Sequence, residues 1–192
     1  MMKKAVVESA KEIYHGRSFS FVKEQVTLPN GRTAEMACVR HPGSTAIVPL
    51  LEDRTVLLTR QYRYAVGSYL LEVPAGTMEP GESPLSCAKR ELQEEIGMIG
   101  EAFTYLSHIH ILPSYSDEKI HVYLAQGLRP DRQNLDDDEI IQVVRYPLEQ
   151  AMNMITAGDI TCALTIVALH RACSYLESER RDVEPERLLE DF

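Results

Sequence analysis

Three glutamates in this chain are spaced so that they share one face of a helix. Glu91, Glu94 and Glu95 stand at positions i, i+3 and i+4, and side chains with that spacing lie side by side on an α-helix. Like charges held this close destabilise a helix by about 0.2–0.5 kcal/mol. A divalent cation with oxygen ligands would offset the repulsion, so the three side chains are candidate metal ligands. A solvated acidic face without a ligand is the alternative.

The helix that carries the glutamates has recognisable ends. We expect it to lie between Ser83 and Gly97, because Ser83 is a candidate N-cap, Pro84 suits the first turn and Gly97 is a candidate C′ residue. Three aliphatic side chains at helical spacing form a narrow stripe, which should be the buried one. They are Leu85, Leu92 and Ile96.

The spacing of the residues around this helix carries a more specific signal. The segment GTMEPGESPLSCAKRELQEEIGM has the form G-x5-E-x7-R-E-U-x-E-E-x-G-U, where U is a bulky aliphatic residue. Gly76, Glu82, Arg90 and Gly97 fill specified positions, and Met98 serves as the final aliphatic residue. This pattern resembles the signature of the Nudix hydrolase family. The resemblance implies an α/β fold, an α/β/α sandwich with a mixed sheet, and hydrolysis of a nucleoside diphosphate linked to another group.

The resemblance extends to one branch of that family. Pro113 lies sixteen residues after Gly97, a distance that marks the ADP-ribose pyrophosphatase branch. The segments RHPGSTAIVPL, QYRYAVGSYLLEVPAG and PSYSDEKIHVYLA are also similar to that branch. The chain departs from the branch at Ser114, where glycine is usual, at Asp137, where glutamate is usual, and at Gln142, which replaces an acid. These departures leave the exact substrate open: ADP-ribose is expected, and GDP-mannose, another ADP-sugar or a dinucleotide are alternatives.

The resemblance also implies a cofactor and its ligands. Glu91 and Glu95, helped by Glu94 and the backbone carbonyl of Ala75, would bind Mg²⁺. Magnesium prefers oxygen ligands and keeps several waters, and Mn²⁺ should substitute for it. A ligand-binding sensor that has lost catalysis is a further alternative, against which the three intact glutamates speak.

Roles in catalysis are expected for Arg90, Glu94, Glu139 and Asp137, and Glu94 is also an expected metal ligand. Arg90 is expected to orient Glu82 and the neighbouring carboxylates, with substrate contact as the alternative. Glu82 is either structural or an outer acid. The general base stays open between Glu139 and Asp137, which lie in one acidic loop. A loop that is merely solvated is the alternative.

The remaining candidate residues concern the substrate and the backbone. Arg63 is a candidate for phosphate or ribose binding, or an ordinary surface arginine. Glu118 is a candidate for metal or ribose contact, and Pro113 belongs to the loop expected at the substrate. Gly76 is expected to let the backbone turn sharply before the helix, which would leave the Ala75 carbonyl facing a metal.

Alternating and apolar runs predict the elements that must position these residues. Residues 12–41 should form strands, as a hairpin that turns at residues 29–31 and needs a partner surface on its own domain or across a dimer. We expect an N-terminal β region over residues 1–41, a hydrolase domain over residues 42–180 and a charged tail over residues 181–192. The tail should fray from Ser178. Strands are expected at 18–27, 32–40, 44–51, 55–61, 69–73, 102–111, 119–126 and 140–145, and further helices at 147–157 and 161–177.

Composition limits the partners. With 192 residues and 44% apolar content the chain should form one domain with a sizeable core. Its net charge of −9 argues against a nucleic-acid surface, and it has no apolar run long enough to span a membrane. Four scattered cysteines without CxxC spacing favour a reducing cytoplasm. The family resemblance suggests a homodimer.

Overall fold

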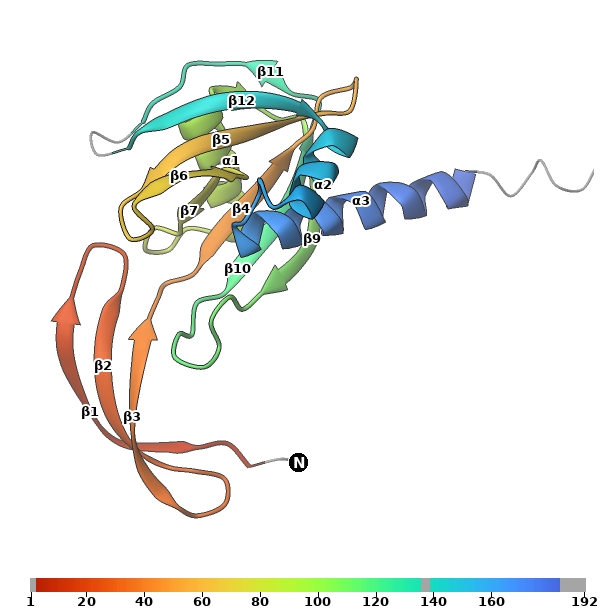
Figure 1. The fold of residues 1–192 in the computed structure, drawn as a ribbon. Coiled ribbons are helices and arrows are strands. Elements are labelled where there is room, and N and C mark those ends of the chain that lie inside the picture. Colours follow the sequence, from red (N-terminus) through yellow and green to blue (C-terminus); the bar gives the residue numbers. More distant parts are fainter. Residues whose placement is uncertain (1–2, 136–138, 184–192) are drawn as a thin grey trace, which may run out of the picture.

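A computed structural model describes residues 3–135 and 139–183 of the protein (Figure 1). Three helices and twelve strands lie within those residues. The helices are α1 (Pro84–Ile96), α2 (Leu148–Ala157) and α3 (Ala163–Val183). The strands are β1 (Val6–His15), β2 (Ser20–Thr27), β3 (Thr33–Arg40), β4 (Ser44–Pro49), β5 (Thr55–Arg63), β6 (Ser68–Glu72), β7 (Ala75–Thr77), β8 (Met98–Ile99), β9 (Ala102–Ile109), β10 (Ile120–Gln126), β11 (Arg129–Pro130) and β12 (Ile141–Pro147).

The first three strands form an antiparallel sheet, in the order β1-β2-β3, that projects from the rest of the molecule (Figure 1). The expected hairpin is present as β2 and β3. The hairpin prediction was incomplete, because β1 adds a third strand that pairs with β2. Every residue of β1 is exposed. An exposed strand has no need for alternating apolar and polar residues, so the sequence lacks the signal that would have marked it.

Two further sheets form the centre of the molecule. One has the order β7-β4-β10-β9, with β4 and β10 parallel and the other pairs antiparallel. The other is antiparallel and has the order β12-β5-β6. Helix α1 lies on one side of these sheets, and α2 and α3 lie on the other (Figure 1). This is the α/β sandwich with a mixed sheet that the sequence predicted.

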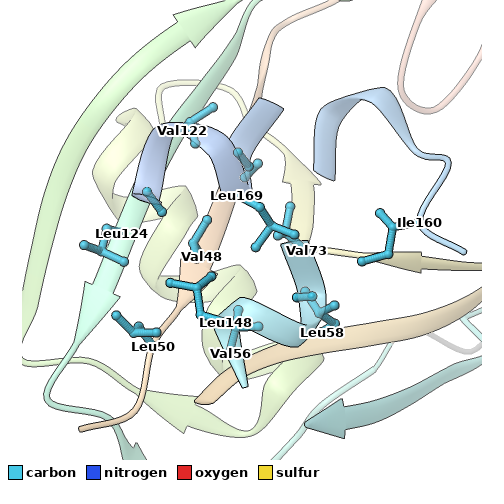
Figure 2. Packing of buried hydrophobic residues seen from close by; sticks show 14 of the residues in the cluster. Val48, Leu50, Val56, Leu58, Val73, Val122, Leu124, Leu148, Ile160 and Leu169 are labelled. Carbon is cyan, nitrogen blue, oxygen red and sulfur yellow. The ribbon is translucent and has the colours of Figure 1, made fainter. Parts of the chain in front are cut away.

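Neighbouring residues of β4 and β5 pack into different halves of the core. Ile47 and Leu57 join Leu92 of α1 in one buried cluster. Val48 and Leu58 point the other way, into the cluster that α2 and α3 cover (Figure 2). A strand covered on both faces needs apolar side chains at successive positions, which explains the unbroken apolar runs that predicted these two strands.

The C-terminal helix is longer than expected. The sequence predicted a helix to about residue 177 and fraying from Ser178, but α3 continues to Val183. The charged residues after Ser178 suit an exposed helix as well as they suit a frayed tail, so charge alone misplaced the boundary. None of the helices within the described residues is long and apolar enough to cross a membrane.

Candidate active site

Helix α1 begins and ends where the sequence indicates. The Ser83 hydroxyl accepts the backbone N–H of Ser86 at 3.1 Å, and Pro84 is the first helical residue. Gly97 follows the last residue with a left-handed φ of 68°, a conformation that favours glycine. The predicted N-cap and C′ residues are therefore confirmed.

The buried stripe of α1 is rotated from the predicted one. Leu85 is 39% exposed, so its predicted burial was wrong, whereas Glu91 and Glu95 are only 7% and 3% exposed. Leu92 and Ile96 are buried as predicted, but the predicted stripe contained only aliphatic residues and placed the glutamates on another face. Instead the two carboxylates turn toward β7, where the Ala75 N–H donates to Glu95 Oε2 at 3.3 Å. Two buried carboxylates require compensation that a hydrophobic stripe would not need.

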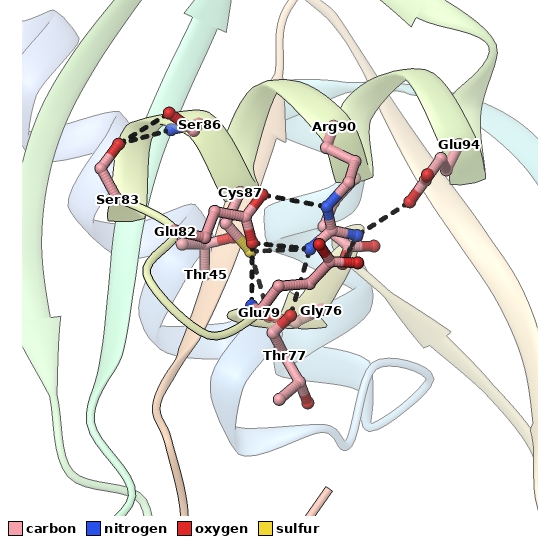
Figure 3. A network of polar contacts seen from close by, with 11 residues as sticks. Thr45, Gly76, Thr77, Glu79, Glu82, Ser83, Ser86, Cys87, Arg90 and Glu94 are labelled. Atoms are coloured by element: carbon pink, nitrogen blue, oxygen red, sulfur yellow. Dashed lines mark hydrogen bonds and ion pairs between the residues drawn. The ribbon is translucent and has the colours of Figure 1, made fainter. Parts of the chain in front are cut away.

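Arg90 supplies part of that compensation (Figure 3). Its Nε and Nη2 atoms donate to the two carboxylate oxygens of Glu82, each at 3.0 Å. Its Nη1 atom lies 2.7 Å from Glu91 Oε1 and 2.8 Å from Glu94 Oε2. Nη2 also donates to the backbone carbonyl of Thr77 at 3.1 Å. One guanidinium thus joins the loop before α1, the strand β7 and two of the three clustered glutamates.

Gly76 is required for a different reason from the predicted one. Its φ is not positive, and it is part of β7, so the expected sharp turn at this residue was wrong. A Cβ atom at Gly76 would overlap the carboxylate of Glu91. The glycine therefore leaves the space in which the Glu91 side chain lies.

Burial and mutual repulsion set the charge state of the glutamates. Burial raises the pKa of Glu91 to about 7 despite the nearby Arg90. Burial, followed by the charges of Glu91 and Glu139, also raises the pKa of Glu95 well above its ordinary value. By contrast, the hydrogen bonds from Arg90 lower the pKa of Glu82. Burial thus disfavours the charged forms of Glu91 and Glu95 more than that of Glu82.

This donor set fits a hard divalent cation. The groups that face one another are carboxylate oxygens, the ligands that Mg²⁺ and Mn²⁺ prefer. A bound cation would favour the charged forms of Glu91 and Glu95, which burial disfavours. Among residues 3–135 and 139–183, no three His, Cys, Asp or Glu side chains already surround a common metal position. Two of the clustered glutamates, Glu91 and Glu94, pair with Arg90.

A cavity of about 750 Å³ opens over the carboxylates. Its lining includes Arg63, whose Nη2 atom pairs with Glu72 Oε2 at 2.6 Å, and Glu139 from the acidic loop. Ala75, Gly76, Arg90, Glu91 and Glu94 also line it. The structure thus brings most of the sequence-predicted site residues together. Asp137, the other candidate base, lies outside the described residues.

Two candidate residues lie elsewhere. Glu118 accepts the Ser44 hydroxyl at 2.8 Å and has His41 Nδ1 at 3.8 Å, and it is not among the residues that line the cavity. Pro113 belongs to a turn that packs on β3, where Val39 N–H donates to the Tyr115 carbonyl. The structure does not bring either residue to the carboxylates.

The cavity also has walls that the sequence did not indicate. Arg17 and Ser18, between β1 and β2, line it, as does Asn134 just before the acidic run. The first two could not be placed because β1 was not recognised. For Asn134 the sequence offers its position just before the acidic loop that carries the two candidate bases.

Comparisons with known proteins give relatives of this chain. The model of the NUDIX domain matches residues 40–162. An ADP-ribose pyrophosphatase of Bacillus subtilis is 31% identical over 161 residues, which cover 83% of this chain and 87% of that protein. A methanol dehydrogenase activator of Bacillus methanolicus is 34% identical with the same coverage. A solved structure described as an ADP compounds hydrolase is 27% identical and has a TM-score of 0.81. The match covers 94% of this chain and 98% of that one.

Proposed function

The chain belongs to the Nudix family, and on that premise we propose that it hydrolyses the pyrophosphate bond of ADP-ribose to give AMP and ribose 5-phosphate. The observation that carries this proposal is that Glu91, Glu94 and Arg90 of α1 line a cavity of about 750 Å³, a volume typical of small-molecule sites. The third glutamate of the cluster, Glu95, is buried beside them on the same helix. A relative named ADP-ribose pyrophosphatase supports this choice of substrate. A relative of similar identity with another name, methanol dehydrogenase activator, is the reason to test other substrates.

Mg²⁺ is the proposed cofactor, with Mn²⁺ as a substitute. Glu91, Glu94, Glu95 and the Ala75 carbonyl would hold it, because they provide oxygen donors and an excess of negative charge. When bound, the metal neutralises phosphate charge and lowers the pKa of a coordinated water. Deprotonated Glu91 and Glu95 are needed for this binding, so cation affinity should depend on pH.

The chain's own residues provide positioning and proton transfer. Arg90 orients Glu82, Glu91 and Glu94 through the hydrogen bonds described above, rather than through contact with the substrate. Glu139 is the proposed general base, because it is partly buried and lines the cavity that Glu91 also lines. It would take a proton from the attacking water, which requires hydrogen-bond reach before any matching of pKa.

Arg63 is the proposed contact for a phosphate or ribose oxygen. It reaches the cavity while Glu72 holds its guanidinium through Nε at 2.8 Å and Nη2 at 2.6 Å. Glu72 is buried, so this ion pair fixes the direction of the arginine. A pre-oriented guanidinium loses little entropy when it binds an anion.

A homodimer is the proposed assembly, and residues 1–41 are the proposed dimerisation region. The side chains of Val6, Val7, Ile13 and Tyr14 on β1 are 47–56% exposed. This strand forms one edge of the projecting sheet, and a small exposed sheet with apolar side chains needs a surface to cover it. We place the protein in the cytoplasm, because its four cysteines are free thiols.

The test is release of phosphate from the products by an added phosphatase, measured over a panel of substrates. The panel contains ADP-ribose, GDP-mannose, ADP-glucose, FAD, NADH and diadenosine polyphosphates, each with Mg²⁺ and with chelator. We expect Mg²⁺-dependent preference for ADP-ribose. Preference for another member would reassign the substrate but keep the chemistry, whereas no turnover of any member would favour a ligand sensor.

A further inference from the structure

The C-terminal end of α1 depends on donors from a distant part of the chain. The last four carbonyls of an α-helix have no partner within the helix. Here the Glu94 carbonyl accepts the backbone N–H of Asn134 at 3.0 Å. The Glu95 carbonyl accepts the side-chain amide of Gln133 at 2.6 Å. The backbone of the two glutamates is therefore tied to residues 133 and 134.

Gly97 allows this close approach. Its carbonyl accepts the Asp131 N–H at 2.8 Å. A Cβ atom at Gly97 would lie 3.2 Å from the Asp131 carbonyl oxygen and 3.2 Å from the Gln133 nitrogen, which is closer than ordinary van der Waals contact. The segment 131–134 thus lies directly against the end of the helix.

The same segment forms a wall of the cavity. Asn134 lines it together with Glu94, whereas Gln133 is not among the lining residues. Gln133 therefore stands behind the wall and connects it to the helix that carries the clustered glutamates. The strand that follows is fixed separately, because Tyr62 N–H donates to the Ile140 carbonyl at 3.2 Å.

We propose that Gln133 is a positioning residue, whose side-chain amide on the Glu95 carbonyl fixes the cavity wall at Asn134 relative to the carboxylates of α1. Its action in turnover rests on the proposed hydrolysis. Gln133 acts through Glu95 and Asn134 and does not touch the substrate. Its loss changes the distance between the two sides of the cavity, and small misplacements of this kind lower the rate of the chemical step more than they lower substrate binding.

Three substitutions at Gln133 separate the amide from the rest of the side chain. Gln133→Met keeps the length and removes the donor. Gln133→Glu replaces the donor by an acceptor facing a carbonyl. Gln133→Lys keeps a donor at the end of a flexible side chain. The matched control is Gln150→Met, which changes an exposed glutamine on α2 outside the cavity.

The expected result is a split between kcat and KM. Gln133→Met should lower kcat for ADP-ribose about tenfold and leave KM within about twofold of the wild-type value. Gln133→Glu should lower kcat further, Gln133→Lys should restore most of it, and Gln150→Met should behave as wild type. A wild-type kcat in Gln133→Met would overturn the proposal. Equal losses of kcat in Gln133→Met and Gln133→Lys, together with a lower Tm in both, would also overturn it. That result would describe a helix cap without a role in positioning.

Hydrogen exchange provides a readout that does not need activity. The Asn134 amide should exchange faster in Gln133→Met and Gln133→Glu than in wild type and Gln133→Lys, because its hydrogen bond to Glu94 is no longer held in place. Unchanged exchange would overturn the proposal even if kcat fell. If the wild-type protein hydrolyses no member of the substrate panel, the proposed function fails, and the exchange of Asn134 still decides whether Gln133 holds the wall.

Discussion

Arg90 holds Glu82 at two points, with Nε on one carboxylate oxygen and Nη2 on the other, each at 3.0 Å. A guanidinium can make this planar two-point contact and still direct Nη1 at Glu91 and Glu94. A lysine ammonium is a single point and cannot hold all three carboxylates in the same arrangement. The geometry therefore explains an arginine, and not only a positive charge, at this position.

Arg90→Lys should lower turnover about 10- to 100-fold and reduce the free energy of unfolding by about 2 kcal/mol. The physical reason is the loss of several charge-assisted hydrogen bonds to partly buried carboxylates. Urea unfolding and initial rates measure the two effects. Arg171→Lys, on an exposed part of α3, is the control and should change neither. Wild-type turnover in Arg90→Lys would contradict the orienting role.

Gly76→Ala should abolish most activity, because the added methyl group would occupy the space of the Glu91 carboxylate. Gly81→Ala is an informative comparison. Gly81 has a φ of 81° and open space around its Cβ position, so alanine there should cost about 1 kcal/mol of stability through backbone strain without affecting catalysis. Steady-state rates and thermal unfolding measure both variants. If Gly76→Ala lost stability but kept its rate, the close packing on Glu91 would have no functional meaning.

Glu91 and Glu95 should make the metal-free protein less stable as pH rises. Burial raises the pKa of Glu91 to about 7, from 4.5, and raises that of Glu95 as well. Such groups bind more protons when folded than when unfolded, so their contribution to stability is complete below pH 4.5 and is lost as pH rises toward about 7. The measurement is the urea midpoint of wild type and of the double variant Glu91→Gln/Glu95→Gln, each in chelator at about pH 5 and about pH 7.5. Between these two pH values the midpoint of wild type should fall relative to that of the double variant.

The double variant corrects for every other group that titrates in that range. If the difference in urea midpoint between wild type and the double variant were the same at both pH values, the prediction would be contradicted. Added Mg²⁺ should stabilise the wild type more at the higher pH, because its ligands must be deprotonated. The double variant should show no such gain.

Ile13→Glu should convert the proposed dimer into a monomer, because it would place a charge in the apolar surface of β1. Ile99→Glu is a matched control, since Ile13 and Ile99 are 47% and 42% exposed and Ile99 lies on β8, which is not part of the β1-β2-β3 sheet. Light scattering would give the mass of each protein. A wild-type protein that is monomeric at working concentrations, or a dimer that survives Ile13→Glu, would rule out this surface as the interface.

Much of the fold followed from local patterns. The caps at Ser83 and Gly97 marked the ends of α1, and apolar runs marked β4 and β5. The exposed strand β1 was missed, because nothing in its own composition reports that β2 pairs with it. Its recognition depends on a long-range contact, which a local pattern does not contain.

The candidate site could also be predicted only where local patterns carry the information. Its acidic and basic side chains could be identified because they lie on one helix and in the loop before it. The contacts of Gly76 and Gln133 could not be identified from the sequence, since each depends on a neighbour brought close by folding. That neighbour is the Glu91 carboxylate for Gly76 and the Glu95 carbonyl for Gln133. The prediction of a purely aliphatic buried stripe also misplaced part of the buried side of the helix, which includes Glu91 and Glu95 and leaves Leu85 exposed.

The most direct test of the account is the rate of ADP-ribose hydrolysis by wild type and Glu95→Gln, each with Mg²⁺ and with chelator. Glu149→Gln, a glutamate substitution on the exposed surface of α2, is the control. We expect Mg²⁺-dependent hydrolysis by wild type and Glu149→Gln, and a rate at least about 100-fold lower for a folded Glu95→Gln protein. Hydrolysis by Glu95→Gln at the wild-type rate would show that the buried carboxylates of α1 do not carry the reaction.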